Sequence, residues 1–416
     1  MGVIINIDEA LKNRTDYNVL GEPLNAMIKN QQEAWERENP IDMIYVRNSI
    51  DKFQETYVSS IGFDKAFVET NDYAIGPIFN TAEGFSATYR TRTFQGSFII
   101  TQQTLEDRQY GTAKDTANAF VKRWHGDIVE YAMAALGAGH GVEVVWGGDG
   151  KDGKSRLKLN SADTTDGDIT GTKNPLFYNH HTIVKRDGMS AADITTAYQS
   201  NNFYANIDYK GDDPARIAKL ADVINQVITY MENLKDDNNK YAGVMGEKTI
   251  VAANDPLLKA AIETALSMDM FKQGESYYPN PAYKKATLKT TPYLNTLAQT
   301  RGGRGFFIVD KSYNAENHGL EFTERLALTL DVIEQKRPKG IIYDGRQRFD
   351  INVATWRGIA YVYLGTPDGD SGEWNELEDF TQITPQATVV KPVSIDGTVT
   401  TVVSGTVKTE TAASGS

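Results

Sequence analysis

The stretch GFSATYRTRTFQGSFIITQQTLEDRQYGTAKDTANAFVKRWHGDIVEYAMAAL, residues 84–136, decides the fold of this chain. Apolar and polar residues alternate over 85–92, which is the period of a β-strand. The segment SFIIT, 97–101, has the composition of a return strand, and the residues between the two runs include a glycine. We therefore predict a turn at 93–96 and interpret 83–111 as an extended β-hairpin.

A long amphipathic helix is predicted to follow the hairpin. Apolar residues recur at steps of three and four up to Leu136, and two glycines just beyond it end the pattern. A helix over 112–136 is roughly 36 Å long at the usual rise per residue. We expect Phe120, Trp124 and Ile128 to face the core from this helix.

The predicted hairpin needs a partner outside its own domain. A two-stranded hairpin is marginally stable alone in water, and apolar strands with free edges pair with other chains. We therefore expect its apolar and basic side chains to contact a neighbouring copy; these are Phe85, Tyr89, Arg90, Arg92, Phe94 and Phe98. The pattern predicts a building block of an assembly and not an enzyme.

The composition fits a soluble globular protein of more than one lobe. The chain has 416 residues, of which 40% are hydrophobic and 24% charged, and no apolar run is long enough for a membrane span. The absence of cysteine excludes disulfides and thiolate chemistry. A net charge of −12 argues against sequence-specific nucleic-acid binding, which needs a basic surface. No catalytic, metal or cofactor site is predicted.

The middle of the chain has the pattern of an α/β lobe. Residues 1–82 lack a self-contained core and are interpreted as an N-terminal arm. Residues 147–212 are rich in glycine and aspartate and are interpreted as an insertion. A well-capped helix begins at Asp213-Pro214, and short apolar strands such as GFFIVD, 305–310, alternate with further helices, so 213–312 is predicted to form one α/β unit.

Long strands follow this lobe. The segment LEFTERLALTLDVI, 320–333, alternates over its whole length, and three more strands are predicted at 339–344, 349–356 and 359–364. We expect these to form an antiparallel sheet with the helix at 112–136 on one face. The lobe is then an excursion within one domain formed by 112–146 and 313–365. The tail, 366–416, either adds strands to a neighbour or is disordered.

This order of elements resembles the major capsid protein of tailed bacteriophages, the Hong Kong 97 type of fold. The residues that carry the resemblance are 84–136, 213–256 and 320–364. The resemblance implies an α+β phage capsid fold with an N-terminal arm, an extended β-hairpin loop, a peripheral domain in which a spine helix lies on an antiparallel sheet, and an α/β axial domain.

The resemblance also implies a function. A major capsid (head) protein self-assembles through hexamers and pentamers into an icosahedral shell that encloses double-stranded DNA in the virion. It is assembled in the cytoplasm of the host bacterium. The implied partners are further copies of the chain, a separate scaffolding protein, a portal and a decoration protein, with DNA held only by non-specific proximity, and neither a membrane nor a cofactor.

Covalent cross-linking in this family is one property that the sequence addresses. Some members join a lysine of the extended loop to an asparagine of a neighbouring subunit. Here no lysine occurs between Lys65 and Lys114, so the hairpin predicted at 83–111 has no amine to offer. We therefore expect a non-covalently linked shell.

Two alternatives remain open from the sequence. The segment GDGKDGKS, 148–155, matches the phosphate-binding loop of nucleotide-binding proteins, and the strand-like FFIVD, 306–310, resembles a magnesium-holding strand. That chemistry needs a helix that begins at Lys154-Ser155, whereas the residues that follow alternate like a strand. The other alternative is a β-rich virion adhesin, which needs exposed aromatic residues gathered in a cleft.

Overall fold

The computed structural model describes most of the chain between Asn39 and Gly365. The described residues are 30, 33, 35, 39–63, 81–101, 103–104, 107, 110–140, 144–146, 155–157, 160–165, 173–178, 181, 199–205, 207, 209, 214–236, 240–273, 276–294, 305–336, 339–365, 389–390, 393–394, 401–403 and 406–408.

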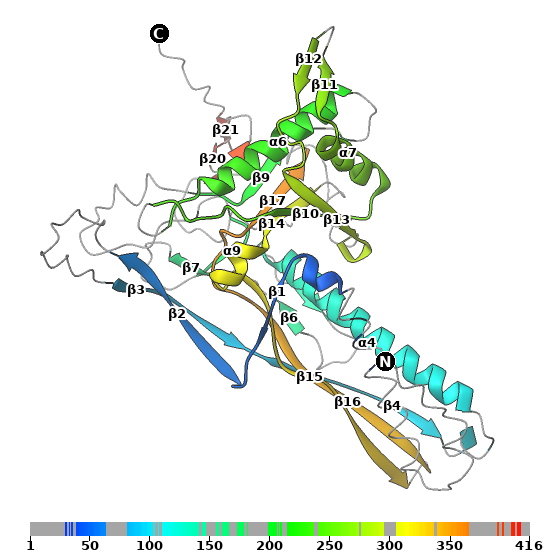
Figure 1. Ribbon diagram of the computed structural model, residues 1–416. Helices are drawn as coiled ribbons and strands as arrows, with labels where there is room; N and C mark the ends of the chain where they lie inside the picture. Colours follow the sequence, from blue (N-terminus) through cyan, green and yellow to red (C-terminus); the bar gives the residue numbers. More distant parts are fainter. Residues whose placement is uncertain are drawn as a thin grey trace, which may run out of the picture.

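The first of two main sheets has four strands in the order β1-β15-β16-β4 (Figure 1). β15 (Leu320–Lys336) and β16 (Lys339–Val353) form a long antiparallel hairpin. β4 (Arg92–Thr101) runs antiparallel to β16, and β1 (Val46–Ser49) runs parallel to β15. We call this the peripheral sheet.

The predicted long helix is confirmed as α4 (Tyr110–Ala138). Its N-terminal half lies along one face of the peripheral sheet, where Ala113 and Ala117 pack against Ile100 and Tyr343 (Figure 1). Its C-terminal half enters the main hydrophobic core, and from Tyr131 to Ala138 all but one of its residues are buried. One helix therefore supports both halves of the molecule.

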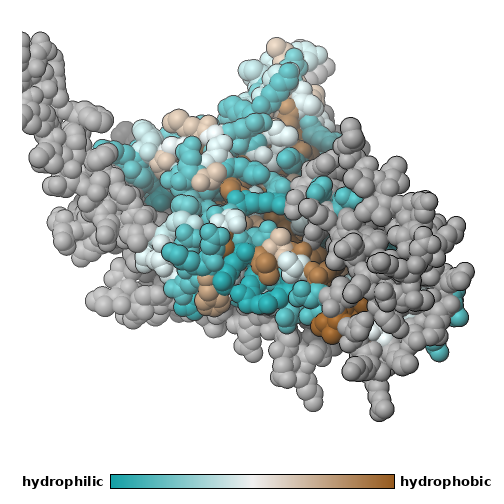
Figure 2. Space-filling view, turned by 60° about the horizontal axis from the view of Figure 1, so that its bottom comes forward, coloured by the Kyte–Doolittle hydropathy of each residue, from teal (hydrophilic) through white to brown (hydrophobic). Residues whose placement is uncertain are grey.

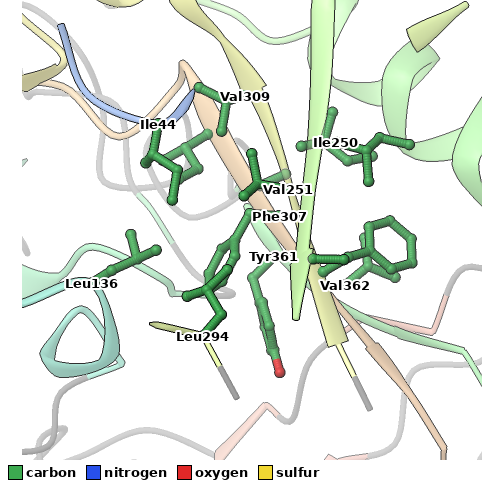
Figure 3. Packing of buried hydrophobic residues seen from close by; sticks show 14 of the residues in the cluster. Ile44, Leu136, Ile250, Val251, Leu294, Phe307, Val309, Tyr361 and Val362 are labelled. Carbon is green, nitrogen blue, oxygen red and sulfur yellow. The ribbon is translucent and has the colours of Figure 1, made fainter. Parts of the chain in front are cut away.

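The second sheet has six strands in the order β13-β10-β14-β17-β9-β19. Figure 3 shows its core, in which Val251, Phe307 and Val362 come from three adjacent strands. The helix α7 contacts β10 and β13, and α6 packs beside α7. The bounds of these elements are β9 (Asn202–Ala205), β10 (Lys248–Ala253), β13 (Ala286–Thr291), β14 (Gly305–Asp310), β17 (Ile359–Leu364), β19 (Val393–Ser394), α6 (Pro214–Glu232) and α7 (Pro256–Ser267).

The remaining elements are short or form small separate sheets. They are β2 (Gln54–Phe63) with β3 (Thr81–Arg90), β5 (Val144–Trp146) with β6 (Ser155–Leu157), β7 (Asn160–Thr165) with β8 (Lys173–Pro175), β11 (Met270–Gln273) with β12 (Ser276–Pro279), β18 (Val389–Val390) with β20 (Thr401–Val403) and β21 (Thr406–Lys408), the helix α9 (Lys311–Glu316), and the 3₁₀ turns η1 (Pro40–Met43) and η2 (Pro292–Leu294).

The pairing predicted for the hairpin at 83–111 is wrong. β3 pairs with β2, and β4 pairs with β16, so the two predicted partners do not pair with each other. Gly96 was interpreted as a turn residue but lies inside β4. A Cβ atom there would be 3.0 Å from the ring of Trp124, so the glycine permits close packing of helix and sheet.

Two further expectations about the closing strands are also wrong. The predicted strands 339–344 and 349–356 are largely one strand, β16, because Gly345 lies under Phe120 of α4 and does not end the strand. The predicted strand 359–364 is β17, which pairs with β14 and β9 in the second sheet and not with the peripheral sheet.

The region interpreted as an insertion also contributes to the core. β9 lies within 147–212 and is a strand of the second sheet, and Leu176 and Phe177 are fully buried.

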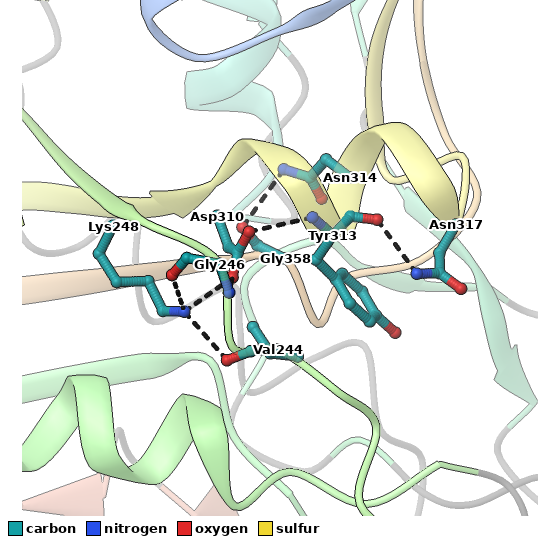
Figure 4. Close-up of polar contacts among 8 residues, drawn as sticks. All are labelled: Val244, Gly246, Lys248, Asp310, Tyr313, Asn314, Asn317 and Gly358. Atoms are coloured by element: carbon teal, nitrogen blue, oxygen red, sulfur yellow. Dashed lines mark hydrogen bonds and ion pairs between the residues drawn. The ribbon is translucent and has the colours of Figure 1, made fainter.

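A buried ion pair fixes the point where the chain passes from the second sheet to the peripheral sheet (Figure 4). Lys248 Nζ lies 2.7 Å from Asp310 Oδ2, and both side chains are almost fully buried. The ammonium also donates to the carbonyl oxygens of Val244 and Gly246, both at 2.9 Å. The other carboxylate oxygen of Asp310 accepts from the backbone N–H of Tyr313 and so caps α9, which leads into β15. The pair thus joins β10, β14 and α9.

Substitution of Lys248 by methionine tests this junction. It leaves the carboxylate of Asp310 buried without its charged partner, which we expect to lower the free energy of unfolding by about 3–5 kcal/mol. Urea denaturation followed by circular dichroism measures the loss. Lys259→Met removes an exposed lysine from α7 and is the control, with an expected change within about 0.5 kcal/mol. Equal stability of the two variants contradicts this assignment.

Candidate inter-subunit surface

β2 and β3 form a two-stranded ribbon that projects from the rest of the molecule (Figure 1). The strands are antiparallel from Gln54 opposite Arg90 to Phe63 opposite Thr81. Among the described strands, none is hydrogen-bonded to either outer edge of this ribbon. The real ribbon therefore begins well before residue 83 and has the free edges that the sequence led us to expect for a hairpin at 83–111.

The base of the ribbon is anchored by aromatic residues. Tyr89 is only 1% exposed, and its hydroxyl donates to the carbonyl oxygen of His318 at 2.9 Å. The ring of Tyr57 packs against the rings of Tyr89 and His318, with centroid distances of 4.8 and 3.9 Å. Burial raises the pKa of Tyr89, and the nearby carboxylate of Glu321 raises it further. The hydroxyl therefore stays protonated and donates this hydrogen bond.

A polar network extends this anchor to the peripheral sheet. His318 Nδ1 lies 3.0 Å from Glu321 Oε1. Asn48 of β1 donates to Glu321 Oε2 and to the hydroxyl of Tyr57, both at 2.9 Å. The base of the ribbon is therefore held at the start of β15, whereas its far end lies away from the sheet.

The structure gives four of the predicted contact residues partners within the chain. Tyr89 is buried as described, and Arg92 Nε lies 3.0 Å from Asp350 Oδ2. Phe94 stacks on Phe349 at 4.4 Å, and Phe98 stacks on Tyr343 at 4.9 Å. The sequence predicts that these four residues contact a neighbouring copy. In the structure Tyr89 is buried at the base of the ribbon, and the rings of Phe94 and Phe98 on β4 pack against α4.

The other two predicted contact residues belong to the ribbon. Arg90 is exposed, and its Nε donates to Gln54 Oε1 across the ribbon at 3.0 Å. The backbone of Phe85 lies in β3, and its side chain is outside the described residues.

The three residues predicted to face the core from the long helix all pack inward. Ile128 is buried, and Phe120 and Trp124 are half-buried against the peripheral sheet. Trp124 Nε1 donates to Gln347 Oε1 of β16 at 2.6 Å. These contacts make α4 and the sheet a rigid support for the ribbon.

Sequence reasoning missed the polar side chains that join α4 to the peripheral sheet. Asp350 accepts a hydrogen bond of 2.6 Å from the hydroxyl of Tyr131 on α4 as well as that from Arg92. Burial raises the pKa of Asp350, and Arg92 opposes the shift. A single acidic residue in an alternating strand carries no signal that would identify it as a contact to the helix.

The helix also holds a residue from the N-terminal arm. His125 is buried and stacks on Trp35, with ring centroids 4.2 Å apart. Burial lowers the pKa of His125 to about 4, so the imidazole is neutral at pH 7. Trp35 of the segment 1–82 therefore lies on α4, whereas β1 and β2 of the same segment belong to the peripheral sheet and the ribbon.

The nucleotide-binding alternative is wrong. Ser155 begins the strand β6 and pairs with Trp146 of β5, whereas the phosphate-binding motif requires a helix at this position. The residues 147–154 lie outside the described residues. The carboxylate of Asp310, which the alternative assigns to magnesium, is instead bonded to Lys248 and caps α9. Over the described part of the chain there is no cluster of side chains suited to a metal ion, and no helix there is long and apolar enough to cross a membrane.

Known proteins resemble this chain in structure only. No family model and no curated protein matches the sequence. A virus-like particle from Pyrococcus furiosus matches at 8% identity and a TM-score of 0.41, covering 82% of this chain and 99% of that one. The capsid of Myoviridae phage XM1 matches at 11% identity and a TM-score of 0.41, covering 77% of this chain and 90% of that one. The mature capsid of bacteriophage PhiM1 matches at 11% identity and a TM-score of 0.42, covering 77% of this chain and 85% of that one. All three are capsids or virus-like particles, and the TM-scores are modest.

Truncation of Tyr89 tests the anchor of the ribbon. Tyr89→Ala empties a buried site, and we expect it to lower the free energy of unfolding by about 3–5 kcal/mol. Limited proteolysis, read by mass spectrometry, is expected to cut faster within residues 54–90. Tyr277→Ala, at a tyrosine that is 66% exposed on β12, is the control and is expected to leave both measurements unchanged. An unchanged cleavage pattern in Tyr89→Ala contradicts the assignment of Tyr89 as the anchor of the ribbon.

Proposed function

We propose that this chain is the major capsid (head) protein of a tailed bacteriophage, which self-assembles through hexamers and pentamers into an icosahedral shell around double-stranded DNA. The observation that carries the proposal is the ribbon β2–β3. No described strand is hydrogen-bonded to its outer edges, and it projects from a rigid helix and sheet, as an arm that reaches a neighbouring chain does.

A ribbon that projects toward the next copy favours assembly of the copies into rings. The ribbon of one copy and the surface that receives it on the next copy are different patches, so the contact is head-to-tail. Head-to-tail contacts close into rings when the rotation between copies permits it. Hexamers and pentamers are such rings, and a shell combines both.

Individually weak contacts are sufficient for a shell. Burial of an exposed aromatic residue such as Phe53, which is 59% exposed where the chain enters β2, contributes roughly 1.5–3 kcal/mol before the cost of ordering. Every subunit of a closed shell makes several such contacts. The N-terminal segment before β1 and the tail beyond β19, which is itself a strand of the second sheet, are proposed to tie further neighbours by added strands.

The remaining features of the proposal follow from the charge and from the resemblance. A chain of net charge −12 is suited to enclose DNA without binding it tightly. The proposed partners are a separate scaffolding protein, a portal and a decoration protein. The proposed location is the virion, after assembly in the host bacterial cytoplasm, and no enzymatic activity or cofactor is part of the function.

Electron microscopy of the purified chain tests this function. We expect closed shells when the full chain is expressed, alone or with its scaffolding protein. A variant in which 55–89 is replaced by a short glycine-serine linker removes the ribbon while keeping α4 and both sheets, and it is expected to form no shells. A full-length chain that stays a compact monomer under all these conditions refutes the proposal.

The corrected bounds of the ribbon change the argument about cross-links. Lys65 lies between β2 and β3, so the ribbon segment does contain one amine. We retain the proposal of a non-covalent shell, and Lys65 is the residue on which it can be tested.

Denaturing electrophoresis tests whether the shell is covalent. We expect particles boiled in detergent to give a single monomer band, because only non-covalent contacts join the subunits. Lys65→Arg keeps the charge, removes the reactive amine and is expected to give the same gel. A ladder of multimers that disappears in Lys65→Arg shows that the ribbon is covalently joined.

A further inference from the structure

A stacked pair of rings joins the N-terminal part of the chain to α4. The ring centroids of Trp35 and His125 are 4.2 Å apart, and the two ring planes differ by only 10°. His125 is 7% exposed, and Trp35 is half-buried against the main hydrophobic core. We call this pair the Trp35–His125 stack.

The hydrophobic effect favours the stack as long as both rings are uncharged. Figure 2 shows the underside of the molecule in Figure 1, where hydrophobic patches interrupt a hydrophilic surface. A released Trp35 would add an exposed indole to such a surface, whereas the stacked ring removes apolar area from water.

The chain that follows the stack is held in the core by other contacts. Ile41 is fully buried, and the hydroxyl of Tyr45 donates to the carbonyl oxygen of Ala132 on α4 at 2.6 Å. The side chain of Asn39 accepts from the backbone N–H of Ile41 at 2.9 Å and caps η1. The stack can therefore open without disturbing the core, because the chain is already fixed at Asn39, a few residues after Trp35.

The charged groups of α4 near His125 offer no acidic partner to a protonated imidazole. Arg123 and Asp127 form an ion pair with each other, with Nε 2.8 Å from Oδ1. Lys122 precedes His125 by about one turn of the helix and is exposed. Among the described residues, no carboxylate forms an ion pair with His125.

The elements packed beside the stack add one more cation. The guanidinium of Arg47 on β1 lies 5.8 Å from the centre of the Trp35 ring, and its Nε is 2.8 Å from Oδ1 of Asp42 on η1. Glu33, in the same helical segment as Trp35, is exposed. Tyr293 of η2 lies beside α4.

Protonation of His125 opposes the stack for two reasons. The charged ring would be removed from water, and this burial holds the pKa of His125 at about 4. A cation is attracted to the face of an indole, but Arg47 already lies over the ring of Trp35 and repels a second positive charge there.

The stack is therefore weakened by acid. A histidine in water has a pKa of about 6.5, so the released state binds a proton more readily than the stacked state. The stack has its full stability above about pH 6.5 and loses stability as the pH falls toward the pKa of about 4 that His125 has when stacked. Between pH 7.5 and pH 5, the ratio of stacked to released chains is expected to fall roughly thirtyfold.

We propose that the Trp35–His125 stack is an acid-sensitive contact, which holds the segment that carries Trp35 on α4 at neutral pH and releases it when the imidazole is protonated. The contact lies within one chain, so this inference goes beyond the proposed function and does not depend on it. In a shell, the pH would decide whether this segment stays on its own α4 or is available to a neighbour.

Hydrogen exchange of the full chain, read by mass spectrometry, is the first test. The protection of backbone N–H groups in residues 30–38, corrected for the pH dependence of exchange itself, is expected to fall roughly thirtyfold between pH 7.5 and pH 5. His125→Phe keeps a flat ring that carries no charge and is expected to remove most of this fall. The control His318→Asn changes a histidine at the base of the ribbon to a residue that tolerates its positive φ, and it is expected to keep the fall.

Three results overturn the inference. One is equal protection of residues 30–38 at both pH values in the parent chain. Another is a fall that persists in His125→Phe, because a different group then responds to acid. The third is an equal loss of protection in β10, which shows that acid unfolds the whole chain and does not act on the stack.

A titration of the histidines by NMR tests the cause directly. The chain has five histidines, and the signal that is missing from His125→Phe belongs to His125. In the parent chain this signal is expected to titrate near pH 4. Trp35→Ala opens the imidazole to water and is expected to move the titration toward about pH 6.5. Titration of His125 near neutral pH in the parent chain, or no change on removal of Trp35, contradicts the inference.

Discussion

The fold depends on the sharing of one helix by two sheets. α4 has 29 residues, about 43 Å of helix. Its first half packs on β4 and β16, and its second half is part of the core of the second sheet. The opposed glycines of the peripheral sheet, Gly96 and Gly345, allow the rings of Trp124 and Phe120 to approach the backbone. The two halves of the molecule are thereby joined as one body.

A second junction lies where the chain itself crosses between the sheets. Lys248 and Asp310 are buried together, and their polar contacts join the loop before β10, at Val244 and Gly246, to the first turn of α9, at Tyr313. A buried pair of this kind is strongly destabilising when one partner is lost, so it fixes geometry more than it adds net stability. With α4 on one side and this pair on the other, the orientation of β15 and β16 relative to the second sheet is constrained twice.

The ribbon contrasts with this rigid body. It is held at its base by Tyr89, Tyr57 and the network around Glu321. β7 lies beside β3, but no described strand is hydrogen-bonded to the outer edges of the ribbon. A ribbon with a fixed base and unpaired outer edges is able to meet a neighbour at slightly different angles. A shell made of both five-membered and six-membered rings requires such tolerance, which links the unequal support of the two parts to the proposed function.

The sequence by itself determined the elements that have a strong local period. The helices α4 and α6 and the strand β14 follow from apolar spacing and from start signals such as Pro214, the first residue of α6. It also indicated that β3 and β4 are strands, although it paired them with each other. Only the tertiary structure decided which strands pair, because the partner of β4 lies more than two hundred residues away and the glycine that suggested a turn serves helix packing. Alternation likewise puts Arg346 and Arg348 on one face of β16, but only the pairing of β15 with β16 brings Arg325 near Arg348.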